Sequence, residues 1–144
     1  MQKKLNNVIG LAGVHGPGWS GGARRTTEPP PRTRMSGPYD LTFDSLQRVV
    51  TQGRTGVFAI GQTDVSGTFR VQRVGRADDD VLEALRLLIG CGNQFKFAIF
   101  TSAREAFDTE CELFHRLRPP STIIHPSRPA GTDWKCHWCT QLHL

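Results

Sequence analysis

The chain has 144 residues, of which 38% are hydrophobic and 22% are charged, with four cysteines and a formal net charge of +5. This length allows one domain with a hydrophobic core but hardly two, and the apolar fraction is low enough that part of the chain is not expected to pack. No apolar run is long enough to cross a membrane, which argues against a membrane protein.

The positive charge lies in the first 35 residues, which hold six basic side chains against Glu28 alone. This segment contains GPGWSGGARRTTEPPPRTR, a composition that predicts a flexible basic arm over residues 1–35. Residues 36–144 hold twelve basic and twelve acidic side chains, so the expected folded domain is neutral as a whole. Such an arm adds sequence-independent attraction to phosphate, whereas the domain brings no large field of its own.

The first half of the expected domain predicts a helix followed by a β-hairpin. Apolar residues recur at helical spacing in TFDSLQRVVTQ, residues 42–52, with Thr42 or Asp40 as the N-cap. TGVFAIG (55–61) and GTFRVQRVG (67–75) are rich in Val, Phe and Ile and are separated by turn residues. These two segments therefore predict paired strands.

The second half adds two helices around a third strand. ADDDVLEALRLLIG (77–90) opens with three acids at the positive end of a helix, and its apolar residues would face inward as far as Leu88 and Ile89. QFKFAIF (94–100) alternates as a strand, and REAFDTECELFHRLRP (104–119) reads as a helix capped from Ser102. The order predicts an α+β domain over residues 36–144, with a small three-stranded antiparallel-type sheet flanked by helices.

The cysteines and histidines near the end of the chain predict a structural zinc site. Cys111 and His115 lie four residues apart, on one face of the last predicted helix. Cys136 and Cys139 have the Cys-x-x-Cys spacing of a zinc knuckle. Thiols reserved for a metal suit a reducing, cytoplasmic location. The predicted ligands are Cys111, His115, Cys136 and Cys139, with His125 and His137 as rival ligands.

Three segments stand in the order of a known signature: Gly56-Val57-Phe58 on the first hairpin strand, Arg73-Val74-Gly75 on the second, and Glu110 on the last helix. Over about residues 54–139 the chain resembles the GIY-YIG nuclease superfamily. The ending IHPSRPAGTDWKC with its Cys pair is similar to a branch that carries a C-terminal Cys-x-x-Cys. The resemblance implies a metal-dependent endonuclease with two tyrosines, a helix arginine, and a glutamate that holds a divalent ion.

The chain departs from this signature at most of its chemical positions. Phe58 replaces the first tyrosine and has no hydroxyl, and Arg73 replaces the second and stays protonated. The helix arginine falls at Glu83 or Ala84. The resemblance thus implies a degenerate member, whose expected function is nucleic-acid binding, to DNA or RNA, or regulation.

Two other functions remain open from the sequence. One is an active endonuclease that uses magnesium or manganese with Glu110, Arg76 and Arg86 in altered catalytic geometry. The other is an adaptor that binds a protein partner and has no nucleic-acid role. Cleavage of labelled nucleic acids separates the first two, and salt-dependent binding separates both from the adaptor.

Overall fold

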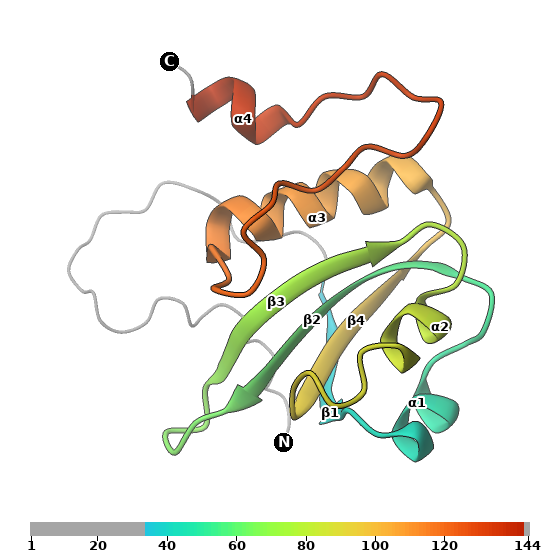
Figure 1. Ribbon diagram of the computed structural model, residues 1–144, viewed down its shortest axis with the longest axis vertical. Coiled ribbons are helices and arrows are strands. Elements are labelled where there is room, and N and C mark those ends of the chain that lie inside the picture. Colours follow the sequence, from blue (N-terminus) through green and yellow to red (C-terminus); the bar gives the residue numbers. More distant parts are fainter. Residues whose placement is uncertain (1–33, 143–144) are drawn as a thin grey trace.

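The computed structural model describes residues 34–142, so the expected arm over residues 1–35 lies outside the described part apart from its last two residues. Four strands and four helices follow one another there (Figure 1). In chain order they are β1 (Ser36–Asp40), α1 (Phe43–Val49), β2 (Thr55–Thr63), β3 (Phe69–Ala77), α2 (Val81–Arg86), β4 (Gln94–Phe100), α3 (Ala103–Leu117) and α4 (His137–Leu142). The α+β class is as predicted.

The sheet has four strands rather than the three expected, in the order β1-β4-β2-β3, with every pair antiparallel. The missed strand is β1, whose sequence SGPYD pairs Tyr39 with Phe95. Pro38 lacks a backbone N–H and argues against a central strand, but an edge strand tolerates it because one side of its backbone has no partner strand. The sequence analysis therefore predicted no strand over these residues.

The hairpin of β2 and β3 forms as predicted and carries the signature positions. Phe58 pairs with Gly75 and Ile60 pairs with Arg73 across the two strands. The turn is held by Asp64, whose carboxylate accepts from the backbone N–H of Ser66 and of Thr68, at 2.9 and 3.0 Å. This local capping keeps the strands in register up to the bulge after Ile60.

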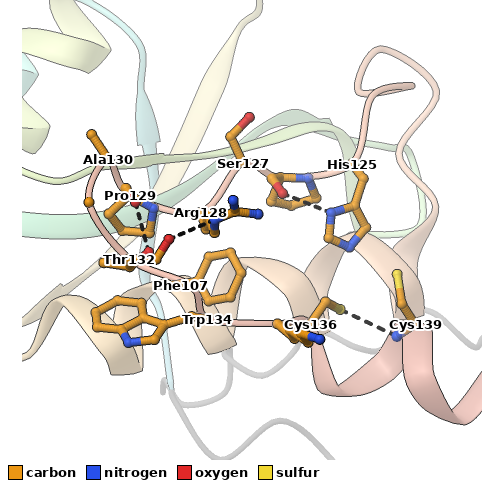
Figure 2. A pocket seen from close by; sticks show the side chains of 13 residues that line it. Phe107, His125, Ser127, Arg128, Pro129, Ala130, Thr132, Trp134, Cys136 and Cys139 are labelled. Carbon is orange, nitrogen blue, oxygen red and sulfur yellow. Dashed lines mark hydrogen bonds between the residues drawn. The ribbon is translucent and has the colours of Figure 1, made fainter.

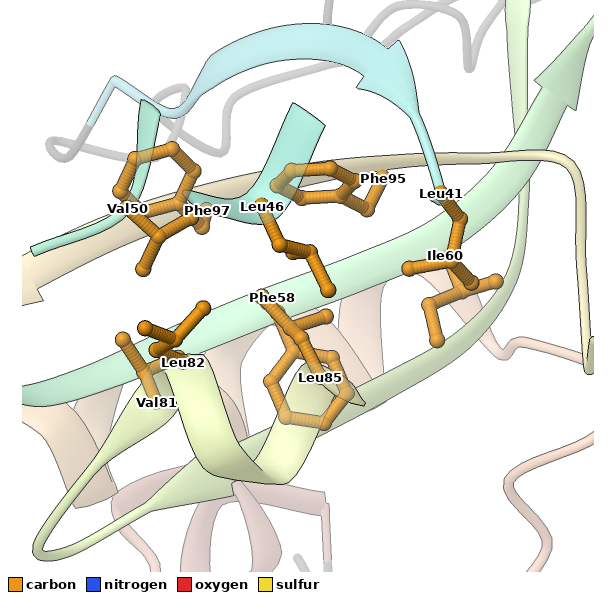
Figure 3. Close-up of a cluster of buried hydrophobic side chains, with 10 residues drawn as sticks. All are labelled: Leu41, Leu46, Val50, Phe58, Ile60, Val81, Leu82, Leu85, Phe95 and Phe97. Atoms are coloured by element: carbon orange, nitrogen blue, oxygen red, sulfur yellow. The ribbon is translucent and has the colours of Figure 1, made fainter. Parts of the chain in front are cut away.

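Helices cover both faces of the sheet. The α1 and α2 side carries a core built around Phe58 and Ile60 of β2 and Phe95 of β4, with Leu46 and Leu85 from the helices (Figure 3). Each such side chain contributes about 1.5–3 kcal/mol when fully buried. The other face is covered by α3, with a second cluster of Val57, Ala59, Val74, Ala106 and Leu113.

Lys96 is a charged residue within that second layer. It alternates with Phe95 and Phe97 on β4, and so points to the side that α3 covers, where its side chain is 2% exposed. Its Nζ lies 5.1 Å from the ring centre of Phe69. Burial lowers the pKa of Lys96 to about 7.

The helix after the hairpin is shorter than predicted. Asp80 caps α2 by accepting from the N–H groups of Leu82 and Glu83, but the helix ends at Arg86 rather than near residue 90. Ile89 is 40% exposed, so the expectation that it faces inward is wrong. Tight turns, such as the bond from Cys91 N–H to the Leu88 carbonyl, redirect the chain towards β4.

Helix α3 lies between the sheet and the C-terminal segment. Ser102 caps it as predicted, accepting from the N–H of Glu105 at 3.2 Å, and Arg118 ends it in the left-handed conformation. The chain then runs beside β3, where the Ser121 N–H donates to the Gln72 carbonyl, crosses α3 and finishes in α4 on the side of α3 away from the sheet (Figure 1). Within residues 34–142 no helix combines the length and apolar character needed to span a membrane.

Candidate metal centre

Two histidines and two cysteines converge where the C-terminal segment crosses the end of α3. His115 comes from the last turns of α3 and His125 from the loop that follows it. Cys136 and Cys139 flank the start of α4. Their potential ligand atoms all lie within 4.8 Å of one another. This His₂Cys₂ group can hold a metal ion.

His125 has a ring nitrogen that the protein leaves unsatisfied. Its Nδ1 lies 2.7 Å from the carbonyl oxygen of Pro126, a contact that places the ring proton on Nδ1. The Nε2 atom then carries a lone pair, is buried, and has no hydrogen-bond partner among the residues described. An unsatisfied buried polar atom costs about 1–3 kcal/mol. A metal ion at Nε2 removes that cost, and the Nδ1 contact orients the ring as in other metal-bound histidines.

The spacing between His115 and Cys139 fits a tetrahedral ion. His115 Nε2 and Cys139 Sγ are 3.4 Å apart. Bonds of about 2.0 Å to nitrogen and 2.3 Å to sulfur at a tetrahedral angle place these atoms about 3.5 Å apart. Burial, together with neighbouring His125, lowers the pKa of His115, which keeps its imidazole neutral. A neutral imidazole is the form that binds a metal.

The two cysteines are positioned by their own helix start. The backbone N–H of Cys139 donates to Cys136 Sγ at 3.4 Å, so the Cys-x-x-Cys turn directs both sulfur atoms to one side. Burial raises the pKa of Cys139, and the hydrogen bond with Cys136 raises it further. Without a metal the Cys139 thiol stays protonated at neutral pH, so metal binding at this thiol releases a proton.

Cys111 is not part of this group, although the sequence suggested it as a ligand. It lies one turn before His115 on α3, is 1% exposed, and packs with Phe107 and Cys136. Burial and a hydrogen bond with Cys136 raise the pKa of its thiol. His125, named from the sequence as a rival ligand, joins the group, and it does so alongside His115.

Phe114 explains how the second histidine reaches the group. Its ring lies 5.3 Å from that of His115 and 5.3 Å from that of His125, edge-on in both cases. The aromatic contact fixes the loop histidine beside the helical one. His137, the other rival, is exposed on α4, where its ring contacts Trp138.

A buried ion pair joins β3 to the same helix, between Arg76 of β3 and Glu110 of α3. Arg76 Nη1 contacts Glu110 Oε1 at 2.6 Å, and both side chains are about 90% buried. Arg76 also reaches Asp78 with Nε at 2.7 Å and the Ser127 carbonyl with Nη2 at 2.7 Å. One guanidinium thereby joins β3, α3 and the C-terminal segment.

The electrostatics of this pair are set by its burial. Burial raises the pKa of Glu110 to about 7, and the attraction of Arg76 offsets only part of that effect. The pKa of Arg76 rises although burial acts to lower it, because its contacts with Asp78 and Glu110 outweigh the burial. Arg76 therefore stays charged, and Glu110 titrates near neutral pH.

The remaining expected catalytic residue, Arg86, lies elsewhere. It sits on α2, pairs with Glu83 at 2.8 Å and lies over the ring of Phe43. Helix α2 covers the opposite face of the sheet from α3. The structure thus brings Arg76 and Glu110 together and separates Arg86 from them.

The signature positions on the hairpin serve the core. Phe58 is buried in the α1 and α2 layer, and its ring occupies the space that a side chain at Gly75 would need. Arg73 pairs with Ile60 and shares that face, whereas Arg76 points to the α3 side. Gly56, on β2, is buried where that strand pairs with β4, beside the Ala98 carbonyl and the Val81 side chain.

A cavity of about 690 Å³ adjoins the metal group and was not foreseen from the sequence (Figure 2). The loop of residues 125–132 forms one side, and Phe107, Trp134 and Lys135 contribute to the others. The sequence offered one signal, the prolines and glycine of IHPSRPAG, which favour a turning loop but do not tell what it encloses.

No protein-family model matches the chain, and neither does any curated protein or solved structure.

Proposed function

We propose that this chain is a nucleic-acid-binding module of GIY-YIG type, with a structural zinc ion in its C-terminal segment and most of its catalytic set replaced. The main support for the proposed loss of catalysis is the 2.6 Å contact between Arg76 Nη1 and Glu110 Oε1. Glu110 occupies the position of the metal-binding glutamate in the resemblance. A carboxylate held in a buried ion pair is already neutralised by an arginine and is a poor site for a divalent cation.

The other signature positions support the same conclusion. Phe58 is a core side chain without a hydroxyl, and Arg73 cannot act as a base. Loss of a single preorganised stabilising donor typically lowers a rate about 10²–10³-fold. With several roles affected, phosphodiester cleavage should be absent or very slow.

The zinc assignment follows from the donor set. Two thiolates and two imidazoles suit zinc far better than magnesium or manganese. Four protein ligands fill a tetrahedral ion and leave no position for a catalytic water. The ion would therefore be structural, and it would fix the C-terminal segment to the end of α3.

The charge of this segment supports a polyanionic partner. After α3, from Arg118 to Leu144, the chain holds three basic side chains, Arg118, Arg128 and Lys135, against Asp133 alone. Its first part lies beside β3, and its last part, with α4, lies on the side of α3 away from the sheet (Figure 1). Basic side chains gathered on one segment attract phosphate through counterion release, and the attraction weakens with salt.

One preparation of the full chain tests this proposal. Anisotropy of labelled single- and double-stranded DNA and RNA should show binding that weakens between 50 and 200 mM salt, roughly the range over which phosphate contacts are screened. Elemental analysis should give about one zinc per chain. Incubation with magnesium or manganese should leave the probes intact.

Two results would contradict the proposal in different ways. Binding to none of the probes at low salt would favour the protein adaptor. Robust cleavage that is lost in Glu110→Ala but kept in Glu105→Ala, an exposed position on the same helix, would establish the endonuclease.

A further inference from the structure

The cavity beside the metal group has the size and position of a ligand site. Its volume of about 690 Å³ lies within the range of about 300–1,000 Å³ usual for small-molecule pockets. His125, Cys136 and Cys139 form part of its wall, so the proposed zinc would hold that wall in shape. The cavity is open to solvent and is not used by any function described above.

The lining carries positive charge without a compensating acid. Arg128 and Lys135 both line the cavity and are exposed, and no Asp or Glu is among its lining residues. Figure 2 shows the Arg128 side chain among the side chains that line the cavity. Such a lining favours an anionic group over a neutral or cationic one.

Two aromatic rings contribute apolar surface to the cavity. Phe107 and Trp134 both line it, with ring centres 6.1 Å apart and planes inclined by 44°. Arg104 lies 5.2 Å over the Trp134 ring but is not among the lining residues, so it holds the indole from outside the cavity. Phe107 is only 2% exposed, so the half-buried Trp134 ring is the one of the two that can present a face, and an aromatic ring beside basic groups is the usual platform for a nucleobase.

The loop that carries Arg128 is fixed before any ligand arrives. Arg128 Nε donates to the Thr132 carbonyl at 2.7 Å, and Thr132 donates to the Pro129 carbonyl through its hydroxyl at 2.7 Å and its N–H at 3.2 Å. Gly131, with φ of 82°, permits this turn. The arginine stem is thus preorganised, which lowers the entropy cost of binding.

We propose that this cavity binds one nucleotide, with its base against Trp134 and its phosphate at Arg128 and Lys135. This inference rests on the proposed nucleic-acid binding. It adds where on the molecule the binding takes place and which class of nucleic acid is bound. A concave site admits an unstacked base but not a duplex, so the ligand is a single strand, or a free nucleotide of the same chemistry.

The test uses the zinc-loaded full chain and labelled oligo-dT and oligo-U of twelve nucleotides. We expect Trp134→Leu to weaken binding about 5- to 150-fold, the range for loss of one stacked base. Arg128→Gln and Lys135→Gln should each weaken binding and reduce the slope of log K against log salt by about 0.7. Matched controls are Arg48→Gln and Phe43→Leu, exposed positions on α1 at the opposite face of the sheet.

Competition separates the two sources of the nucleotide. Displacement of the oligonucleotide by millimolar TMP or AMP assigns the site to a free nucleotide, and resistance to it assigns the site to a strand. Because Trp134 packs near Cys136, zinc content is measured for each variant, and Arg128→Gln tests the site without touching that packing.

The outcomes also separate this inference from the function on which it rests. If the wild-type chain binds no nucleic acid, the proposed function fails and this site fails with it. If the wild type binds but the three cavity variants behave like the two controls, only the cavity assignment is wrong. Binding to duplex as tight as to single strand, with the variants unaffected, would place the interface elsewhere.

Discussion

Replacing Arg76 by methionine should destabilise the domain by about 3–5 kcal/mol at pH 8, because it leaves the Glu110 carboxylate buried without its partner. The side chains of both residues are about 90% buried, and the guanidinium also holds the Ser127 carbonyl at 2.7 Å. The matched control is Arg86→Met. Its ion pair with Glu83 is about half exposed on both sides and should cost about 0–1 kcal/mol.

A double-mutant cycle makes the reasoning refutable. In Arg76→Met/Glu110→Leu neither charge remains, so much of the lost stability should return, since apolar replacement of a buried pair is often nearly neutral. Urea denaturation followed by far-ultraviolet circular dichroism, on zinc-loaded protein, gives the free energy of unfolding for each variant. If Arg76→Met costs no more than Arg86→Met, or if the double variant loses the sum of the single losses, the pair is not the buried couple described.

Three further outcomes follow from the same structure. Cys111→Ser should retain about one zinc per chain by elemental analysis, whereas His125→Gln should lose it. Loss of zinc in Cys111→Ser and retention in His125→Gln would instead support Cys111 as the fourth ligand. Glu110 has a raised pKa of about 7, so its folded state binds more protons, and the Glu110 contribution to stability should rise by about 1 kcal/mol from pH 8 to pH 6. Because Lys96 changes stability in the opposite direction over this range, the rise is measured as the difference between wild type and Glu110→Gln at each pH. Glu110→Gln should lack that rise. Lys96 has a pKa lowered to about 7, so its unfolded state binds more protons above pH 7, and stability should grow with pH by up to about 1.4 kcal/mol per unit towards pH 10. Lys96→Met should remove this dependence on pH, and it should be more stable than wild type at pH 7 by about 2 kcal/mol. A melting temperature equal to or below that of wild type would contradict the burial of the Lys96 charge.

Local patterns were enough to predict most elements of the fold. Alternation gave β4 with its observed bounds, and the cap at Ser102 gave the start of α3; of the two caps considered for α1, Thr42 is the one observed. Two elements were not predicted. One is the short helix α4, and the other is β1, because an edge strand with Pro38 has no local strand signal. The burial of Lys96 was also missed, since alternation tells which face a residue takes but not whether a helix covers that face.

The candidate site was predictable only where its residues follow a local sequence pattern. His115, Cys136 and Cys139 follow from helical and knuckle spacing. The fourth member, His125, depends on the path of a loop, which spacing does not encode. Arg86 was grouped with Glu110 from motif order, but only the structure shows that α2 and α3 lie on opposite faces of the sheet.

The glycines of the hairpin have an evolutionary consequence. A methyl group at Gly75 would collide with the Phe58 ring, and one at Gly56 would lie 2.8 Å from the Ala98 carbonyl oxygen. Both positions are therefore constrained by close packing of this sheet, whatever chemistry the chain performs. Selection for folding alone is enough to preserve them. Glycine at these two positions therefore gives information about the packing of the sheet and none about catalysis.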